Sequence, residues 1–322
     1  MRPDGSPRTP PAEPGKCVFL VNPASANGST GRRWPELARR AAAAGLEGDT
    51  LFSERPGHLA ELARKAALGG AGLLVVVGGD GSVHEVANGL VGLAGQPDVA
   101  LVPRGTGWDF SRTFGISRTI DEAVRVALEG DVRTIDLGRV SYRAWDGTDA
   151  TAHFANVASA GMSGAIAKRA NETTKALGGR ASYLWAIFAV FSGWQASEIE
   201  LSVDGERRSG RMFDVVVANG RFFGGGLRIC PDAKPDDALF DVLTIGNVTK
   251  RDLVLTVPKI YRGTHLPHPK AELLRGTTVS VTSDTPLPIE LDGEQPGTTP
   301  VTFDVVPQAL RLKVPRSAKV SD

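Results

Sequence analysis

Cysteine, histidine and net charge are all scarce in this sequence of 322 residues. The two cysteines, Cys17 and Cys230, lie far apart and form neither a C-x-x-C pair nor a disulfide framework, which favours a reducing cytoplasm. The five histidines form no cluster with the cysteines and no H-E-x-x-H helix, so zinc catalysis has no support. Lysine and arginine total 37 against 36 acidic residues, and this balance predicts no nucleic-acid partner.

Long hydrophobic runs are also missing. The most apolar stretch, 181–194, is shorter than the roughly 20 residues that a membrane-spanning helix needs, so we predict no transmembrane segment. We interpret 181–194 as a core helix, with a lipid-facing wall as the alternative. Residues 1–15 are rich in proline and lack the apolar centre of a signal peptide, so they are predicted to be a flexible tail, as are residues 316–322.

Strand-like and helix-like segments alternate over residues 16–136. Short apolar runs predict strands, and apolar residues at helical spacing predict helices between them. The predicted strands are 17–21, 50–53, 73–77 and 99–102, and the predicted helices are 34–44, 58–68, 83–93 and 120–128. This alternation is typical of an α/β domain with an open parallel sheet, whose ligands lie beyond the carboxyl ends of the strands.

The pattern changes after about residue 136. Eight strand-like segments, most of them bounded by Gly, Asp or Pro, lie between residues 135 and 305, and one mostly helical insertion occupies about 163–195. We therefore predict a second, mainly antiparallel β-sandwich domain at 137–315. A return of its last strand to the first domain is left open.

The strongest chemical signal is the Gly-Gly-Asp-Gly-Ser string at 78–82, which follows an apolar strand and opens a helix. Glycines let the backbone approach a ligand, and the amides of a helix N-terminus favour phosphate. An ordinary strand-to-helix connection would explain the glycines but not Asp80, because an acid beside phosphate is useful only with a metal ion or a proton transfer. The sequence contains no P-loop, no G-x-G-x-x-G after a strand and no G-x-S-x-G elbow.

Several motifs, taken in order along the chain, resemble those of the diacylglycerol kinase catalytic family, which includes bacterial lipid kinases and the sphingosine and ceramide kinases. The resemblance extends over about residues 16–315 and implies a fold like that of diacylglycerol kinases and NAD kinases. The matching motifs are NPAS at 22–25, GGDGS at 78–82, PRGTGWDF at 103–110, FANV at 154–157, the segment 230–241 and LDGE at 291–294.

The resemblance implies that the first domain binds ATP, with Asp80 near the phosphates and magnesium. Hydroxyl groups of Ser25, Ser53 and Thr106 are able to donate hydrogen bonds to phosphate oxygens. The residues at nucleotide-binding positions of the family are Asn22, Ala24, Ser25, Ala26, Asn27, Gly28, Ser53, Gly78, Gly79, Asp80, Gly81, Ser82, Val83, His84, Glu85, Thr106 and Asp109.

A cation site of the family matches Lys234, Asp237 and Leu239, where Lys234 and Leu239 would contribute main-chain carbonyl groups. Oxygen ligands suit a hard ion such as magnesium. The alternative is a plain surface turn, because Asp-Asp clusters usually form turns.

Glu294 matches the proton acceptor proposed for the family, which would take the proton of the attacking hydroxyl group. The alternative is an ordinary hairpin, since Asp-Gly between strands is a strong hairpin signal. Asp80 is the competing catalytic base.

Two positions depart from the family pattern. Trp108 replaces a common Asn, and an indole group cannot reproduce the paired donor and acceptor of a carboxamide, although its face is able to stack on a base or a lipid. Ala238 replaces a usual Gly, a change of little consequence unless the position needs a positive φ.

We therefore predict an ATP-dependent lipid kinase that uses magnesium and acts at the inner face of the membrane as a peripheral cytoplasmic protein. One alternative is an NAD kinase-like enzyme with a soluble acceptor. Another is a nucleotide-regulated lipid-binding protein without turnover, a hypothesis motivated by Trp108. The sequence names no particular lipid, and it leaves a homodimer open. The amphipathic segment 249–262 is interpreted as a solvated helix face, with a membrane contact as the alternative.

Overall fold

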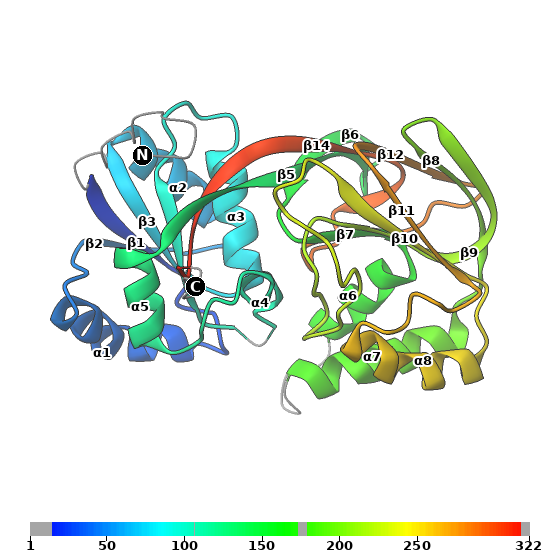
Figure 1. The fold of residues 1–322 in the computed structure, drawn as a ribbon, viewed down its shortest axis with the longest axis horizontal. Helices are drawn as coiled ribbons and strands as arrows, with labels where there is room; N and C mark the ends of the chain where they lie inside the picture. Colours follow the sequence, from blue (N-terminus) through cyan, green and yellow to red (C-terminus); the bar gives the residue numbers. More distant parts are fainter. Residues whose placement is uncertain (1–14, 106, 173–178, 317–322) are drawn as a thin grey trace, which may run out of the picture.

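The computed structural model describes residues 15–105, 107–172 and 179–316. Two domains lie side by side, and two long strands, β5 (Asp131–Ala144) and β14 (Gly297–Val314), run between them (Figure 1). The first domain contains the parallel strands, and the second contains most of the antiparallel ones.

The sheet of the first domain is parallel, in the order β2-β1-β3-β4. Helices cover both of its faces, because successive side chains of a strand point to opposite sides. Val18 and Leu20 of β1 pack in one cluster with α2 and α3, while Phe19 and Val21 pack with α1 and α5 in another. The elements are β1 (Lys16–Val21), α1 (Ser29–Ala43), β2 (Asp49–Phe52), α2 (His58–Leu68), β3 (Ala71–Gly78), α3 (Asp80–Leu90), β4 (Asp98–Pro103), α4 (Asp109–Thr113) and α5 (Ile120–Glu129).

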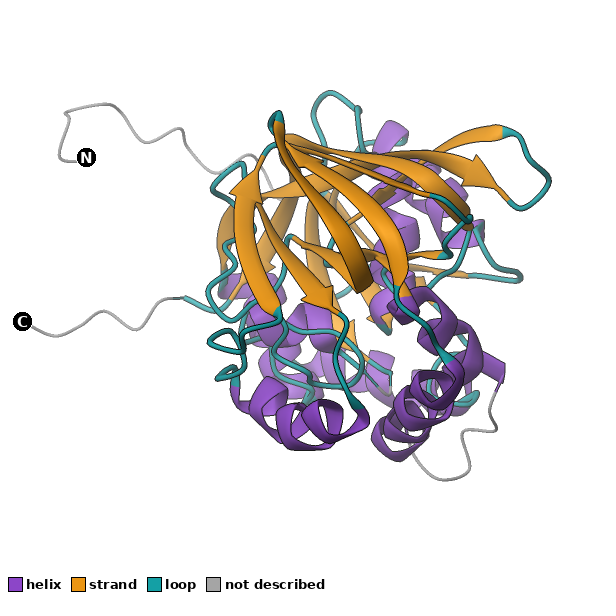
Figure 2. Cartoon of the chain, turned by 90° about the vertical axis from the view of Figure 1, so that its right-hand side faces the viewer, coloured by secondary structure: helices purple, strands orange, loops and turns teal. Residues whose placement is uncertain are grey.

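Antiparallel pairing dominates the second domain, with the strand order β11-β10-β9-β8-β12-β14, and β13 and β7 continue from β9. The strands form a curved layer, and helices lie on one side of it (Figure 2). The remaining elements are β6 (Asp149–Phe154), β7 (Val157–Gly161), α6 (Met162–Glu172), α7 (Gly179–Gly193), β8 (Ser197–Val203), β9 (Glu206–Ala218), β10 (Phe240–Gly246), α8 (Lys250–Arg262), β11 (Ala271–Gly276), β12 (Thr278–Ser283) and β13 (Ile289–Leu291).

Strand β14 belongs to both domains. It pairs with β12 and β5 in antiparallel fashion and reaches β4 as a parallel neighbour, with Leu312 opposite Val99. The last strand therefore returns to the sheet of the first domain. β5 pairs with β14 along nearly its whole length, so it also runs from one domain to the other. The domain boundary predicted at residue 136 therefore falls inside β5.

Several predicted elements have other bounds in the structure, such as the helix predicted at 83–93, which is α3, and the strand predicted at 301–305, which is the much longer β14; two differences have a clear physical reason. The helix predicted at 34–44 begins earlier, at Ser29, so Pro35 lies in its second turn, and the burial of Trp34 and Leu37 offsets the missing amide hydrogen bond. The strand predicted at 153–157 is interrupted at Ala155 and Asn156, because backbone amides there bond to a carboxylate of the second domain, described below. Among the described residues, no helix combines the length and apolarity needed to cross a bilayer.

Candidate active site

A cavity of about 870 Å³ lies between the two domains. From the first domain it is lined by the segments that follow β1, β2, β3 and β4. The second domain contributes Asn156 and Val157, the glycine segment 223–225, and the strand β13 with the turn after it. The site thus lies at the carboxyl ends of the parallel strands, where such sheets bind their ligands.

The Gly-Gly-Asp-Gly loop packs too closely for larger residues. A Cβ atom at Gly78 would collide with the side chain of Ser82, and one at Gly105 would lie 2.8 Å from Cα of Gly79. The side-chain amide of Asn22 donates a hydrogen bond of 3.2 Å to the Ser82 hydroxyl group, which ties the loop after β1 to the start of α3. The loop after β1 is itself tightly curved, since Ala26, Asn27 and Gly28 all have positive φ angles.

Asp80 begins α3, and its carboxylate caps the next helix. Its Oδ2 accepts a hydrogen bond from the amide of Asp109 and its Oδ1 one from the amide of Phe110, both at 3.1 Å. Burial raises the pKa of Asp80, while the two amide hydrogen bonds act in the opposite direction. Both oxygens of this carboxylate therefore already hold a donor, which disfavours Asp80 as the base.

Asp109 links the two domains. Its buried carboxylate accepts a hydrogen bond of 2.7 Å from the amide of Gly225 in the second domain. Trp108, at a φ of 47°, does not line the cavity; the guanidinium groups of Arg112 and Arg118 lie 4.4 and 5.2 Å from the centroid of its ring. The indole group thus stacks on two arginines rather than facing the cavity.

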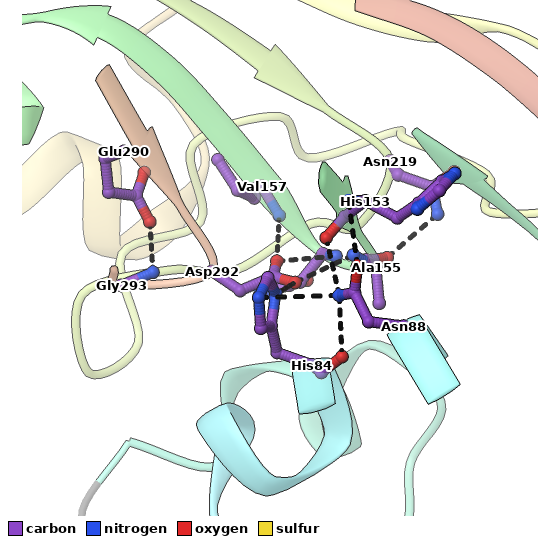
Figure 3. Close-up of polar contacts among 10 residues, drawn as sticks. His84, Asn88, His153, Ala155, Val157, Asn219, Glu290, Asp292 and Gly293 are labelled. Atoms are coloured by element: carbon purple, nitrogen blue, oxygen red, sulfur yellow. Dashed lines mark hydrogen bonds and ion pairs between the residues drawn. The ribbon is translucent and has the colours of Figure 1, made fainter. Parts of the chain in front are cut away.

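A second link joins α3 to the turn after β13, and it is built around Asp292 (Figure 3). The Asp292 carboxylate, with a side chain 2% exposed, accepts a hydrogen bond of 3.0 Å from Nδ1 of His84. It also accepts hydrogen bonds from the backbone amides of Ala155, Asn156 and Val157 at 2.8 to 3.2 Å. Asn88 adds a further contact between α3 and β6 by bonding the backbone of His153.

The pair of His84 and Asp292 makes stability depend on pH. Burial is the largest single cause and acts to lower the pKa of His84, but the hydrogen bond and charge of Asp292, together with the charges of Glu294 and Glu85, outweigh it, so the pKa is raised. The stabilisation is fully present below the unfolded pKa of about 6.5 and is lost as pH rises through the folded pKa. We expect the free energy of unfolding of wild type to exceed that of His84→Gln most at low pH. Denaturant titrations of both proteins between about pH 6 and pH 9 measure this difference.

The buried acids Asp214 and Glu290 are present in both proteins, so their pH-dependent contributions to the free energy of unfolding cancel when the two proteins are compared. A difference that grows with rising pH would contradict the assignment, because it would mean that the folded protein binds its proton on His84 less tightly than the unfolded chain.

Glu290 and Glu294 both line the cavity, on either side of a tight turn. Leu291 and Glu294 exchange two backbone hydrogen bonds across Asp292 and Gly293, whose φ angles are 51° and 96°. This is a two-residue hairpin turn. Glu294 therefore lies both at an ordinary hairpin, as the alternative predicted, and at the cavity. Glu294 is exposed, whereas Glu290 is buried.

Most of the residues predicted from the sequence line this cavity. They are Asn22, Ala24, Ser25, Ala26, Asn27, Ser53, Gly79, Asp80, Gly81, Ser82, His84, Glu85, Asp109 and Glu294. Gly28, Gly78 and Val83 are not among its lining residues, and Thr106 lies outside the described residues. The Ser25 hydroxyl group bonds within its own loop, to the carbonyl oxygen of Asn22 and the hydroxyl group of Thr30.

Sequence reasoning gave no role to Glu290, Asp292 or Arg104, all of which line the cavity. The signal available for Glu290 was a charged residue inside an otherwise apolar strand. Asp292 was missed because Asp-Gly is a common turn sequence, which explains an aspartate at this position without any further role for its carboxylate.

The predicted cation site at Lys234, Asp237 and Leu239 does not line the cavity. Lys234 is exposed, and the carboxylate of Asp237 pairs with Arg275 and accepts a hydrogen bond from the amide of Leu239. In the part of the chain that the structure describes, no group of three or more His, Cys, Asp or Glu side chains is arranged to hold a metal ion. Because main-chain carbonyl groups would supply two of the ligands, the site stays a prediction.

Ala238, next to this segment, has a φ of 58°, a conformation that glycine adopts at lower cost. Its amide donates a hydrogen bond of 2.7 Å to Asp136, which glycine would keep. We expect Ala238→Gly to raise the free energy of unfolding by up to about 1 kcal/mol, measured by denaturant titration. Ala42→Gly on the exposed face of α1 is the control and should lower it by about 1 kcal/mol. A loss of stability in Ala238→Gly would contradict the strain at this position.

Comparisons with known proteins agree with this architecture. The diacylglycerol kinase catalytic domain model matches residues 16–140, and that of the YegS C-terminal NAD kinase beta sandwich-like domain matches residues 156–314. The chain is 25% identical to a diacylglycerol kinase of Staphylococcus saprophyticus over 301 residues, which cover 94% of this chain and 96% of the relative. It is also 25% identical to one of Bacillus subtilis over 299 residues, 92% and 96% of the two chains.

Solved structures show the same fold. A diacylglycerol kinase from Bacillus anthracis superposes with a TM-score of 0.70 at 21% identity, covering 94% of this chain and 97% of that one. Yeast NADH kinase complexed with NADH superposes with a TM-score of 0.51 at 10% identity, covering 95% and 85%. The predicted fold class, an α/β domain with an open parallel sheet followed by a β-sandwich domain, is confirmed.

Proposed function

Because this chain belongs to the diacylglycerol kinase catalytic domain family, a family of kinases, we propose that it transfers the γ-phosphate of ATP to a hydroxyl group of a lipid. The observation that carries the proposal is the cavity between the domains. It brings the glycine-rich loop and Asp80 of the first domain opposite Glu294 of the second. Phosphoryl transfer depends mainly on positioning and charge stabilisation, which such a cavity supplies.

The first domain would hold ATP. The backbone of the loop at 78–82 and the N-terminus of α3 suit phosphate groups, and Arg104, which lines the same cavity, adds a positive charge. Asp80 and Asp109 would hold magnesium, since a Cβ atom at Gly107 would lie 2.9 Å from Oδ2 of Asp80 and 3.6 Å from Oδ2 of Asp109, which places both carboxylate oxygens beside this position. When bound, magnesium would supply positive charge against the charge that develops on the phosphates during transfer.

Glu294 would accept the proton of the attacking hydroxyl group. Its exposed side chain at the cavity is free to approach a lipid headgroup, whereas both oxygens of Asp80 accept backbone amide hydrogens. Asp80 and the loop around it would orient the γ-phosphate for in-line attack.

The helices of the second domain support a lipid as the acceptor. A narrow apolar cavity lies between the sheet and the helices α6, α7 and α8, and Tyr183 and Phe223 line both this cavity and the larger one. The volume of the narrow cavity, about 90 Å³, is enough for a few methylene groups of a hydrocarbon tail, which favour apolar surroundings. On the outside, Trp185 and Phe188 of α7 are exposed, as are Val254 and Leu255 of α8.

This outer face of α7 and α8 suits a membrane surface. Lys250, Arg251, Lys259 and Arg262 of α8 are exposed near its apolar residues, and anionic lipids attract such a combination. We therefore propose a cytoplasmic protein that acts at the inner face of the membrane without spanning it.

The test is transfer of labelled γ-phosphate from ATP with magnesium. Vesicles carrying diacylglycerol, a sphingoid base, a prenol or a phospholipid with a hydroxylated headgroup are compared with NAD as a soluble acceptor. We expect a labelled lipid. Formation of NADP would favour the NAD kinase alternative instead, which shares the fold of yeast NADH kinase. Vesicle binding without any consumption of ATP would favour the lipid-binding protein without turnover.

A further inference from the structure

Two buried carboxyl groups lie where the cavity between the domains, called the phosphate cavity from here on, meets the apolar cavity of the second domain. Glu290 of β13, which is 4% exposed, lines the phosphate cavity. Asp214 of β9, which is fully buried, lines the apolar cavity. Tyr183 lines both cavities and lies close enough to both acids for their charges to raise its pKa, after burial itself. The mechanism proposed above uses neither acid.

The partners of these acids are neutral. Oε1 of Glu290 accepts a hydrogen bond from the amide of Gly293, and the Ser159 hydroxyl group lies 3.4 Å from Oε2. Asp214 accepts hydrogen bonds from the amide and the hydroxyl group of Ser163. Within the described residues, neither acid has a cationic partner, and the backbone amide of Val215 is a further hydrogen-bond donor to Asp214. A buried acid without a cation retains its proton more readily than an exposed one.

Protonation of Glu290 follows from these surroundings. Burial raises its pKa well above the ordinary value for a glutamate, and the charges of Asp292 and Asp214 raise it further. Burial also raises the pKa of Asp214, to about 7. The hydrogen bonds from Gly293 and Ser159 act in the opposite direction, but a buried carboxyl group without a cation favours its uncharged form, which has a proton to donate, as in other active sites.

We propose that Glu290 is a specificity-determining residue, whose carboxyl group donates a hydrogen bond to an uncharged oxygen atom of the acceptor, next to the hydroxyl group that is phosphorylated. This inference rests on the proposed function. With the first carbons of the tail toward the apolar cavity, whose volume is about 90 Å³, and the reacting hydroxyl group near Glu294, the rest of the headgroup passes Glu290. The acceptor class is a neutral lipid with an ester or hydroxyl oxygen beside its reacting hydroxyl group, rather than a lipid with an ammonium group.

A purely supporting role for Glu290 has to be separated from recognition. Its bond to the amide of Gly293 also holds the turn that carries Glu294. Support of the turn would act on turnover with every acceptor, whereas recognition acts on the KM of acceptors that carry the matching oxygen.

The experiment compares Glu290→Gln and Glu290→Met with wild type. Glutamine is uncharged and keeps a donor and an acceptor, so we expect its KM for diacylglycerol in vesicles to stay within about 3-fold of wild type. Methionine has a similar length but no donor, and the loss of one hydrogen bond should raise the KM for diacylglycerol about 10-fold. The KM for ATP should stay unchanged in both variants, as should the KM for a long-chain prenol, which has no second oxygen.

Folding is checked by thermal unfolding, where Glu290→Met should melt below wild type but still cooperatively, because it leaves the amide of Gly293 and the hydroxyl group of Ser159 without an acceptor. Glu198→Met, on the exposed face of β8 and away from both cavities, is the control and should leave every KM unchanged.

Three results would overturn the proposal while wild type phosphorylates lipid. The first is an unchanged KM for diacylglycerol in both variants, and the second is an equal fall of kcat with all acceptors. The third is a rise in this KM that is as large in Glu290→Gln as in Glu290→Met, together with a preference of wild type for a sphingoid base. The last would mean that an ionised Glu290 recognises a cation. If wild type phosphorylates no lipid at all, the proposed function fails and this inference fails with it.

Discussion

We expect Asp80→Asn to lower the rate of phosphoryl transfer roughly 10³-fold or more, because it removes a negative charge from the phosphate site and one of two acceptors at the N-terminus of α4. An asparagine keeps one oxygen but turns an amino group toward the second amide. The measurement is turnover with saturating ATP and lipid, together with the free energy of unfolding.

The control has to separate lost chemistry from a lost cap. Asp204, in the hairpin between β8 and β9, likewise accepts hydrogen bonds from two successive backbone amides, those of Thr277 and Thr278. We expect Asp204→Asn to lose stability of the order of 1 kcal/mol, as Asp80→Asn does, while its turnover stays at the wild-type level. Near-wild-type turnover of folded Asp80→Asn would remove Asp80 from the proposed mechanism.

Glu294→Gln should lower kcat by about 10²-fold to 10⁴-fold, since a glutamine cannot accept the proton of the attacking hydroxyl group. Stability should hardly change, because the Glu294 side chain is exposed and the backbone bonds of its turn remain. The KM for ATP should also stay constant, which separates proton transfer from nucleotide binding. Steady-state kinetics at several lipid and ATP concentrations give both parameters.

Glu198→Gln is the matched control, as an equally exposed glutamate that lines neither cavity. Wild-type turnover in Glu294→Gln combined with an inactive Asp80→Asn would reverse the assignment of the base. Asp80 would then have to release one of its two amide partners when it takes the proton.

Local sequence patterns predicted much of the fold. The helix predicted at 58–68 has these same bounds in α2, because Leu59 and Ala63 repeat at helical spacing and both are buried. Residues 181–194 were predicted to be a core helix, and Ala186, Ile187 and Phe191 of α7 are buried, but Trp185 and Phe188 are not. Apolar residues all round a helix do not tell which side faces the core.

The loops at the candidate site were also visible in the sequence, since the glycines at 78 and 105 are required by close packing that only they allow. The contacts of Trp108 were not. Its arginine partners come from α4 and from the segment before α5, and no sequence pattern indicates that they would cover the indole ring.

The order of strands and helices, the β-rich second half and the family motifs were determined by the sequence alone, because hydrophobic periodicity and turn residues act over a few neighbouring positions. Only the tertiary structure decided which acids are buried. Glu290 loses its solvent because β13 pairs with β7, which places it opposite Ser159. Asp292 meets His84 across 208 positions of sequence, where two domains close on one cavity. Burial and charge at such a place are properties of the packed chain, and no local pattern encodes them.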